Sequence, residues 1–149
     1  MELPRRRPND WQVTLRQALD PLRAAYDLIL VDTDPGLGIL PCIALVAADA
    51  VLIAQPADLL AYRALPSLLE TIDQARRWAP GMPALGIVPT FTGTRTRHET
   101  EVLALLEDQH ADLQLPAIPR RVVVADAAVA GEPVTRFGPL FRRAFPLAW

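Results

Sequence analysis

The sequence contains no lysine, because all fifteen of its basic residues are arginines. Seventeen acidic residues outnumber them, and the net charge of −2 predicts no strong overall attraction to nucleic acid. A single cysteine, Cys42, excludes an internal disulfide and agrees with a reducing compartment. No apolar run reaches the roughly 18 residues of a membrane span, and the start, MELPRRRPND, has no apolar segment of a secretory signal. We therefore expect a cytoplasmic protein without a membrane partner.

Nucleophiles and metal ligands are also scarce. Ser67 is the only serine, and Cys42 follows a proline in an apolar segment, so neither has a neighbouring base. His98 and His110 have no cysteine or second histidine at the spacing that zinc sites use. The sequence therefore favours neither a serine or cysteine hydrolase nor a zinc protein.

Apolar runs alternate with amphipathic segments along residues 11–149, behind a basic, proline-rich arm at residues 1–10. The expected strands are 28–32, 51–54, 84–88 and 115–118. The expected helices are 11–25, one ending near 48, one ending near 78, 97–109, 122–130 and 140–145. This alternation predicts an α/β domain, with a parallel sheet of about four strands flanked by helices. Ligands of such folds bind at the carboxyl ends of the strands, here the loops 32–38, 54–58, 89–96 and 118–121.

Four blocks, in order, resemble segments of the ParA/MinD-type (CobQ/CobB/MinD/ParA nucleotide-binding) partition ATPases. They are YDLILVDTDPGLG, similar to a Walker B strand and switch turn, then ALVAADAVLIAQPADLLAYRALPSLLETI, GIVPTFTGTRTRHETEVLALLE and IPRRVVVADAAVAGEPV. Together they cover about residues 11–145. The resemblance implies a truncated P-loop NTPase fold of the SIMIBI-like kind, comprising the C-terminal two-thirds of the family's domain.

The family's phosphate-binding loop has no counterpart in these 149 residues. No G-x-x-x-x-G-K-[ST] motif occurs, and without lysine no variant of it can neutralise the β/γ oxygens of ATP. We expect no cofactor and no ATP hydrolysis by this chain alone, although the resemblance implies ATP and Mg²⁺. It also implies a missing central strand, so either 28–32 pairs directly with 51–54 or a partner chain supplies that strand.

The resemblance assigns roles at the first turn. Asp32 occupies the Walker B position, which would hold Mg²⁺ through water; the alternative is a loop carboxylate that caps the next helix. Asp34, where the family often has proline, fits an N-cap followed by Pro35 at the first helical position. Gly36 and Gly38 match the turn that senses the γ-phosphate in the family.

Two further surfaces are implied. Pro119 and Arg120, with residues 89–94, match the family's base-side pocket, and a plain surface loop is the alternative. A DNA-binding face is predicted from Arg95, Arg97, Arg120, Arg121, Arg142 and Arg143, with Arg136 as a further contributor. The alternative is a solvated, ion-paired surface.

Three functional hypotheses follow. The first is a ParA-like partition domain, non-catalytic alone, that binds nonspecific DNA, a ParA-type partner, an adaptor or a second copy of itself. The second is an ATPase completed in trans by a separate chain that carries the phosphate loop. The third is a remnant of a full-length ParA-type ATPase without a selected function.

Overall fold

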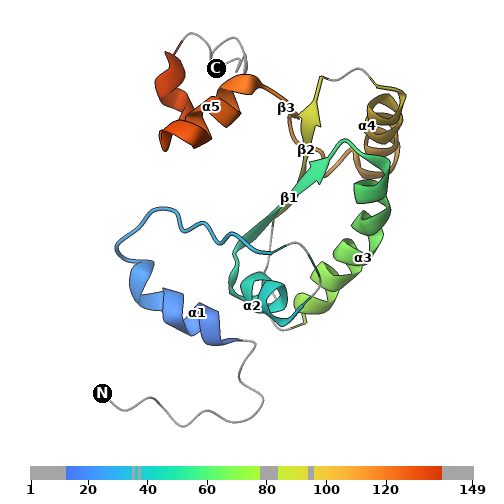
Figure 1. The fold of residues 1–149 in the computed structure, drawn as a ribbon. Helices are drawn as coiled ribbons and strands as arrows, with labels where there is room; N and C mark the ends of the chain where they lie inside the picture. The colour runs from blue at the N-terminus through green and yellow to red at the C-terminus, as the bar shows by residue number, and fades with distance from the viewer. Residues whose placement is uncertain (1–12, 35, 37, 78–83, 94–95, 139–149) are drawn as a thin grey trace. The chain divides into compact units, whose positions relative to one another are not determined.

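The computed structural model describes residues 13–34, 36, 38–77, 84–93 and 96–138 (Figure 1). The chain divides into two compact units, one of Met1–Val51 with Leu65–Leu85 and one of Leu52–Ala64 with Gly86–Trp149. Predicted features at residues 1–10 and 140–145, and the arginines 95, 142 and 143, lie outside the described residues.

The first unit begins with two short helices that pack together. Helix α1 (Thr14–Leu19) continues into the 3-10 helix η2 (Asp20–Leu22), and α1 contacts α2 (Ile39–Ala47). Pro21 lies in the first turn of η2, where its missing N–H removes no helical hydrogen bond. The predicted helix 11–25 is therefore shorter and changes type at the proline. Helix α2 buries Ala44, Val46 and Ala47, as its alanine- and leucine-rich sequence predicts.

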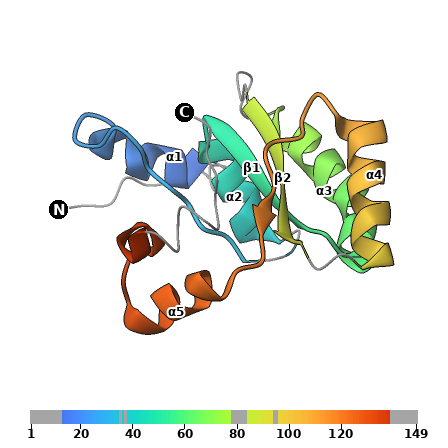
Figure 2. The same cartoon turned by 90° about the horizontal axis from the view of Figure 1, so that it is seen from above.

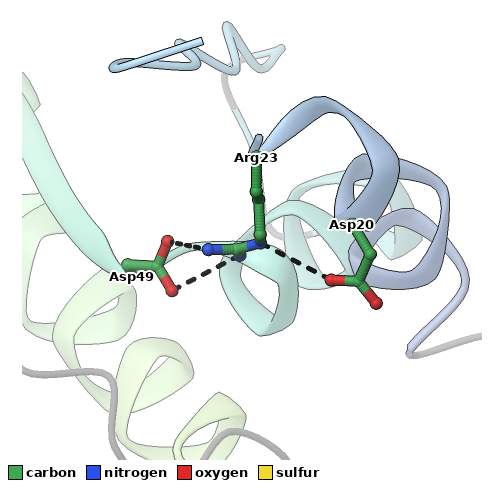
Figure 3. Close-up of polar contacts among 3 residues, drawn as sticks. All are labelled: Asp20, Arg23 and Asp49. Atoms are coloured by element: carbon green, nitrogen blue, oxygen red, sulfur yellow. Dashed lines mark hydrogen bonds and ion pairs between the residues drawn. The ribbon is translucent and has the colours of Figure 1, made fainter. Parts of the chain in front are cut away.

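Arg23 forms ion pairs with two carboxylates in this unit (Figure 3). Its Nη1 donates to Asp49 Oδ2 at 2.7 Å, and its Nε lies 3.5 Å from Asp20 Oδ1. The hydrogen bond from Arg23 lowers the pKa of Asp49, and the same bond raises the pKa of Arg23. These contacts join the end of η2 to the turn after α2.

The predicted strand 28–32 does not form. Residues 28–34 have no regular secondary structure, and Leu28 and Leu30 are 73% and 84% exposed. A strand exists only where a neighbour pairs with its backbone groups, and the sheet of the described residues contains no neighbour for this segment. Of the two predicted alternatives, direct pairing of 28–32 with 51–54 is wrong for the same reason, and a strand supplied by a partner chain stays a prediction.

The sheet has three strands in the order β1-β2-β3, all parallel, rather than about four. They are β1 (Ala50–Pro56), β2 (Ala84–Thr92) and β3 (Ile118–Pro119). Strands β2 and β3 lie side by side in both views (Figure 1, Figure 2), with Thr90 opposite Ile118 and Thr92 opposite Pro119. Upstream of β3, Ile87 forms an isolated parallel bridge with Gln114. The predicted α/β class with a parallel sheet is confirmed.

Long helices connect the strands. Helix α3 (Leu59–Ala75) follows β1, and the Asp58 carboxylate accepts the backbone N–H groups of Leu60 and Ala61 at its start. Helix α4 (Arg97–His110) follows β2 and buries Val102 and Leu106. Tyr62 Oη donates to Gln109 Oε1 at 2.8 Å, which ties the first turns of α3 to the last turn of α4.

The last described elements follow β3. Helix α5 (Val122–Ala130) ends at Gly131, which has a left-handed φ of 65°. Glu132 N–H donates to Ala127 O and Gly131 N–H to Ala128 O, so the helix ends in a Schellman motif. The predicted turn at 131–133 is confirmed, and the 3-10 helix η3 (Val134–Phe137) follows it. No helix in the described part of the chain is long and apolar enough to cross a membrane.

Candidate functional site

The acidic turn of the first unit lines a cavity of about 420 Å³. Its walls come from α1, from residues 31–34 and from α2: Thr14, Leu15, Ala18, Val31, Asp32, Thr33, Asp34, Leu40, Ile43 and Ala44. Asp32 and Asp34 are thus both among the lining residues of this cavity. Gly36 has a φ of 144°, which favours glycine, and Gly38 precedes α2 in extended conformation.

The capping roles predicted for Asp32 and Asp34 are wrong. Helix α2 begins at Ile39, its N-cap residue is Gly38, and no side chain caps it. The turn therefore places both carboxylates several residues before the helix, beyond the reach of an N-cap hydrogen bond, which joins the cap side chain to the second or third helical residue.

Mg²⁺ could find carboxylate oxygens in this cavity, because it needs only one or two of them and takes its other ligands from water and phosphate. A triphosphate would need cationic groups to balance its charge. The lining contains no arginine, and apart from its aspartates and threonines it is apolar. The described lining of this cavity by itself therefore does not fit MgATP, and the described residues contain no group of three or more metal ligands.

A second group of residues lies at the carboxyl ends of β2 and β3, within the second unit. We call it the carboxyl-edge cluster and define it as Phe91, Gly93, Arg97, Arg120 and Arg121. Because β2 and β3 are parallel, their carboxyl ends meet at one edge of the sheet. The Arg120 N–H donates to Thr92 O at 2.8 Å, so backbone pairing continues to this edge.

Phe91 has an unusual backbone in this cluster. It is the only non-glycine residue of the described chain with positive φ, at 57°. Two residues of β2 span the step from Thr90 to Thr92 opposite one step of β3, so Phe91 is the extra residue, as at a β-bulge. Glycine usually takes this conformation, and another residue costs about 1–2 kcal/mol there. Burial repays little of this cost, since Phe91 is still 54% exposed.

Arg120 stacks on this ring. Its Cζ lies 5.0 Å from the Phe91 ring centroid, within the range of a cation–π contact. Such a contact at an exposed site is worth about 0.5–1 kcal/mol, which offsets part of the backbone strain. The stack therefore presents an aromatic ring and a guanidinium together at the surface.

The neighbouring loop is fixed by Glu99. Gly93 N–H donates to Glu99 Oε1, and Glu99 N–H donates to Thr96 Oγ1, which caps α4. Gly93 has a φ of 93°, and a Cβ there would lie 3.6 Å from Arg121 Nη1. The buried Glu99 thus anchors the backbone against which the Arg121 side chain lies.

Arg97, Arg120 and Arg121 are exposed, and within the described residues none of them pairs with a carboxylate. Arg121 Nη1 donates instead to the carbonyl oxygen of Arg120 at 3.2 Å. By contrast, Arg136 pairs with Glu132 at 2.8 Å, so the ion-paired alternative holds for this contributor. The cluster consequently carries positive charge that no described carboxylate neutralises.

Pro119, Arg120 and Arg121 lie where β3 ends beside β2, and Arg97 is the first residue of α4. The predicted residues Asp32, Asp34, Gly36 and Gly38 belong to the other unit. Phe91 did not stand out in the sequence. The signal available was an aromatic residue at the end of an apolar strand, directly before Thr92 and Gly93.

Comparison with known proteins places this fold in a family. The family model described as AAA domain matches residues 1–80. The chromosome partitioning protein ParA of Myxococcus xanthus is 34% identical over 125 residues, which are 80% of this chain and 43% of that protein. The sporulation initiation inhibitor protein Soj of Bacillus subtilis is 29% identical over 135 residues, 89% of this chain and 53% of Soj.

A solved structure agrees with these relatives. Cobyrinic acid a,c-diamide synthase from Mycobacterium smegmatis, with bound ATP analog and magnesium, superposes with a TM-score of 0.67 at 31% identity. The match covers 78% of this chain and 47% of that one. The chain belongs to the ParA/MinD-type P-loop ATPase family, as a partial domain. It spans about half the length of the relatives described above.

Proposed function

We propose that this polypeptide is a ParA-like partition protein that binds DNA without base-sequence preference and does not hydrolyse ATP by itself. The observation that carries the proposal is the carboxyl-edge cluster, where Arg97, Arg120 and Arg121 are exposed without a carboxylate partner among the described residues. Arginines placed in this way bind phosphates of any sequence. The Myxococcus xanthus relative is a chromosome partitioning protein, which supports the proposed partition role.

DNA binding is tested with Arg120→Ala combined with Arg121→Ala. We expect this variant to bind two unrelated duplexes about tenfold or more weakly, since each lost phosphate contact reduces affinity and lowers the salt slope by about 0.9. Fluorescence anisotropy at about 50 and 200 mM salt measures both quantities.

The matched control is Arg76→Ala combined with Arg136→Ala. These arginines are also exposed, but each already pairs with a carboxylate, Asp73 and Glu132 respectively. The control removes the same net charge and should change affinity much less. Equal losses in the two double variants would mean that net charge, and not this cluster, determines binding.

ATP hydrolysis is tested on the purified chain. We expect no metal-dependent, saturable activity, because phosphoryl transfer depends on positioning and on charge stabilisation that a lysine-free chain without a phosphate loop does not supply. Activity that persists through further purification and is abolished by Asp32→Asn would overturn this part of the proposal.

A second candidate, an ATPase completed in trans, is supported by the free edge of β1. This strand pairs only with β2 among the described residues, and its sequence, AVLIAQP, contains no charge. An uncharged edge strand suits pairing with another chain. Co-purification of a chain that carries a phosphate loop, together with restored ATPase activity, would favour this candidate over the first.

A further inference from the structure

We propose that residues 139–149, which follow the described part of the chain, cover the exposed apolar face of helix α5. This interaction does not depend on the proposed DNA binding. Its basis is the composition of α5 (Val122–Ala130), VVVADAAVA, in which Asp126 is the only charged residue. A helix that is apolar on every side normally lies inside a protein, because each of its sides is covered there by other apolar groups.

Only one side of α5 is buried. Val123 and Ala127, which are four residues apart, are the buried residues of this helix. Val122 and Val129 lie on another side, about two helical turns apart, and they are 76% and 91% exposed. Ala125 lies between them and is exposed as well. We call Val122, Ala125 and Val129 the outer face of α5, and the described residues leave it open to water.

The chain leads from α5 directly to the segment that we assign to this face. Gly131 ends the helix, and the 3-10 helix η3 (Val134–Phe137) then packs against α5 (Figure 1). Gly138 follows η3 with a φ of 42°, a conformation that glycine adopts readily. The 139–149 segment therefore starts next to the C-terminal end of α5, and a segment that continues along the outer face runs antiparallel to the helix.

The length and composition of the segment suit the outer face. Its eleven residues span about 16 Å as a helix and more when extended, whereas the nine residues of α5 span about 13 Å. Its sequence, PLFRRAFPLAW, is rich in large apolar residues. Phe141 and Phe145 are four residues apart, the spacing of neighbours on one face of a helix. Burial of a phenylalanine removes about 150–250 Å² from water, so contact with the valines of α5 would stabilise both partners.

The charges of the two partners are opposite. Asp126 is exposed and forms no ion pair with a described residue, and the segment carries Arg142 and Arg143 and no acidic residue. Asp126 lies five residues before the turn glycine Gly131. The arginines lie four and five residues after Gly138, so an antiparallel segment brings opposite charges to a similar level of the helix. Two copies of the chain that paired through α5 would instead bring two aspartates together, and like charges repel.

Thiol labelling tests whether the outer face is covered. Val129→Cys is made in a Cys42→Ala background, so that the chain carries a single thiol. A maleimide should react with it at least about tenfold more slowly than with Leu60→Cys in the same background, because a covered site reacts only while its cover is open. Leu60 is the matched control, since it is 74% exposed on α3. Addition of Phe141→Ala and Phe145→Ala should restore fast labelling of Val129→Cys and leave Leu60→Cys unchanged.

The dependence of the labelling rate on protein concentration identifies the cover. A segment of the same chain protects the thiol equally at about 1 and 100 µM, whereas a second copy protects it more at the higher concentration. Fast labelling at both concentrations, or protection that rises with concentration, would overturn the proposal. Slow labelling that persists in the Phe141→Ala, Phe145→Ala variant would overturn it too, because the cover would then not be this segment.

Melting temperatures give an independent test on the full chain. Alanine forms helices better than valine, so Val122→Ala combined with Val129→Ala should melt no lower than the wild type if the outer face is open to water. We expect the double variant to melt lower, by about 2 °C or more, because it loses the contacts with the segment. Its loss and that of Phe141→Ala with Phe145→Ala should not add when the two are combined, since the residues share one contact. A melting temperature at or above that of the wild type, or fully additive losses, would contradict the proposed cover.

Discussion

The arginines of this chain differ in whether they form an ion pair with a carboxylate. Arg76 and Arg136 each have a partner at 2.8 Å, Asp73 and Glu132. Arg97, Arg120 and Arg121 have none within the described residues. A net charge of −2 therefore conceals a local excess of positive charge. Phosphate binding responds to such a local field more than to the total charge.

Asp49 gives a pH-dependent prediction at the same scale. Its hydrogen bond from Arg23 lowers its pKa in the folded chain. At a pH between the pKa of Asp49 in the folded chain and its pKa in the unfolded chain, the unfolded chain binds more protons. The hydrogen bond therefore stabilises the fold fully above the unfolded pKa of about 3.9. This stabilisation is lost as the pH falls through the lower pKa of the folded chain. We expect Asp49→Asn to melt below the wild type near neutral pH and the gap to close in acid.

Thermal melts followed by circular dichroism from about pH 7 down to about pH 3 measure this gap. Both side chains of the pair are exposed, so the difference should be small and should shrink with added salt. Asp112→Asn is the control, because Asp112 is exposed and forms no ion pair within the described residues. A gap of equal size at every pH would show that the Asp49→Asn substitution disturbs packing and not charge.

Secondary-structure elements were predictable where their signal is local. The stripe at 97–109 predicts α4 (Arg97–His110), and the segment 122–130 coincides with α5. The apolar runs at 51–54 and 84–88 lie inside β1 and β2. The run at 28–32 has the same composition and forms no strand, because strand formation depends on a neighbour that composition does not report. Sequence thus indicates which segments can be strands, and pairing decides which of them are.

The candidate site was likewise predictable from the sequence only in part. The rule that ligands bind at the carboxyl ends of parallel strands directed attention to Pro119, which pairs with Thr92 in the structure, and to Arg120 after it. The role of Phe91 depends on the register between β2 and β3, which makes it the extra residue and gives it a positive φ. Register is a property of two segments far apart in the chain, so neither segment alone could predict it.

At the scale of the whole molecule, several large apolar residues of the described chain are exposed. They include Leu28, Leu30, Leu52, Leu60 and Val129. Leu28, Leu30 and Leu52 lie on segments with unpaired backbone, since β1 has a free edge and the segment 28–34 has no strand partner among the described residues. Exposed apolar surface and an unpaired strand edge both favour association between chains.

Leu52 tests which of these two features drives association. It is 67% exposed on β1, and Leu52→Lys places a charge on the free edge strand, the means by which natural sheets avoid edge pairing. We expect the wild type to associate as concentration rises and Leu52→Lys to remain smaller, as measured by analytical ultracentrifugation over about a hundredfold range of concentration.

Leu60→Lys is the matched control, because Leu60 is 74% exposed but lies on α3, whose backbone groups pair within the helix. It removes as much exposed apolar surface and adds the same charge away from any strand edge. If only Leu52→Lys prevents association, then backbone pairing at β1 is the cause, and the same edge is available to a strand of another protein. If both variants prevent it equally, apolar surface alone drives association, and the edge of β1 loses its support as a docking site for a chain that completes the ATPase.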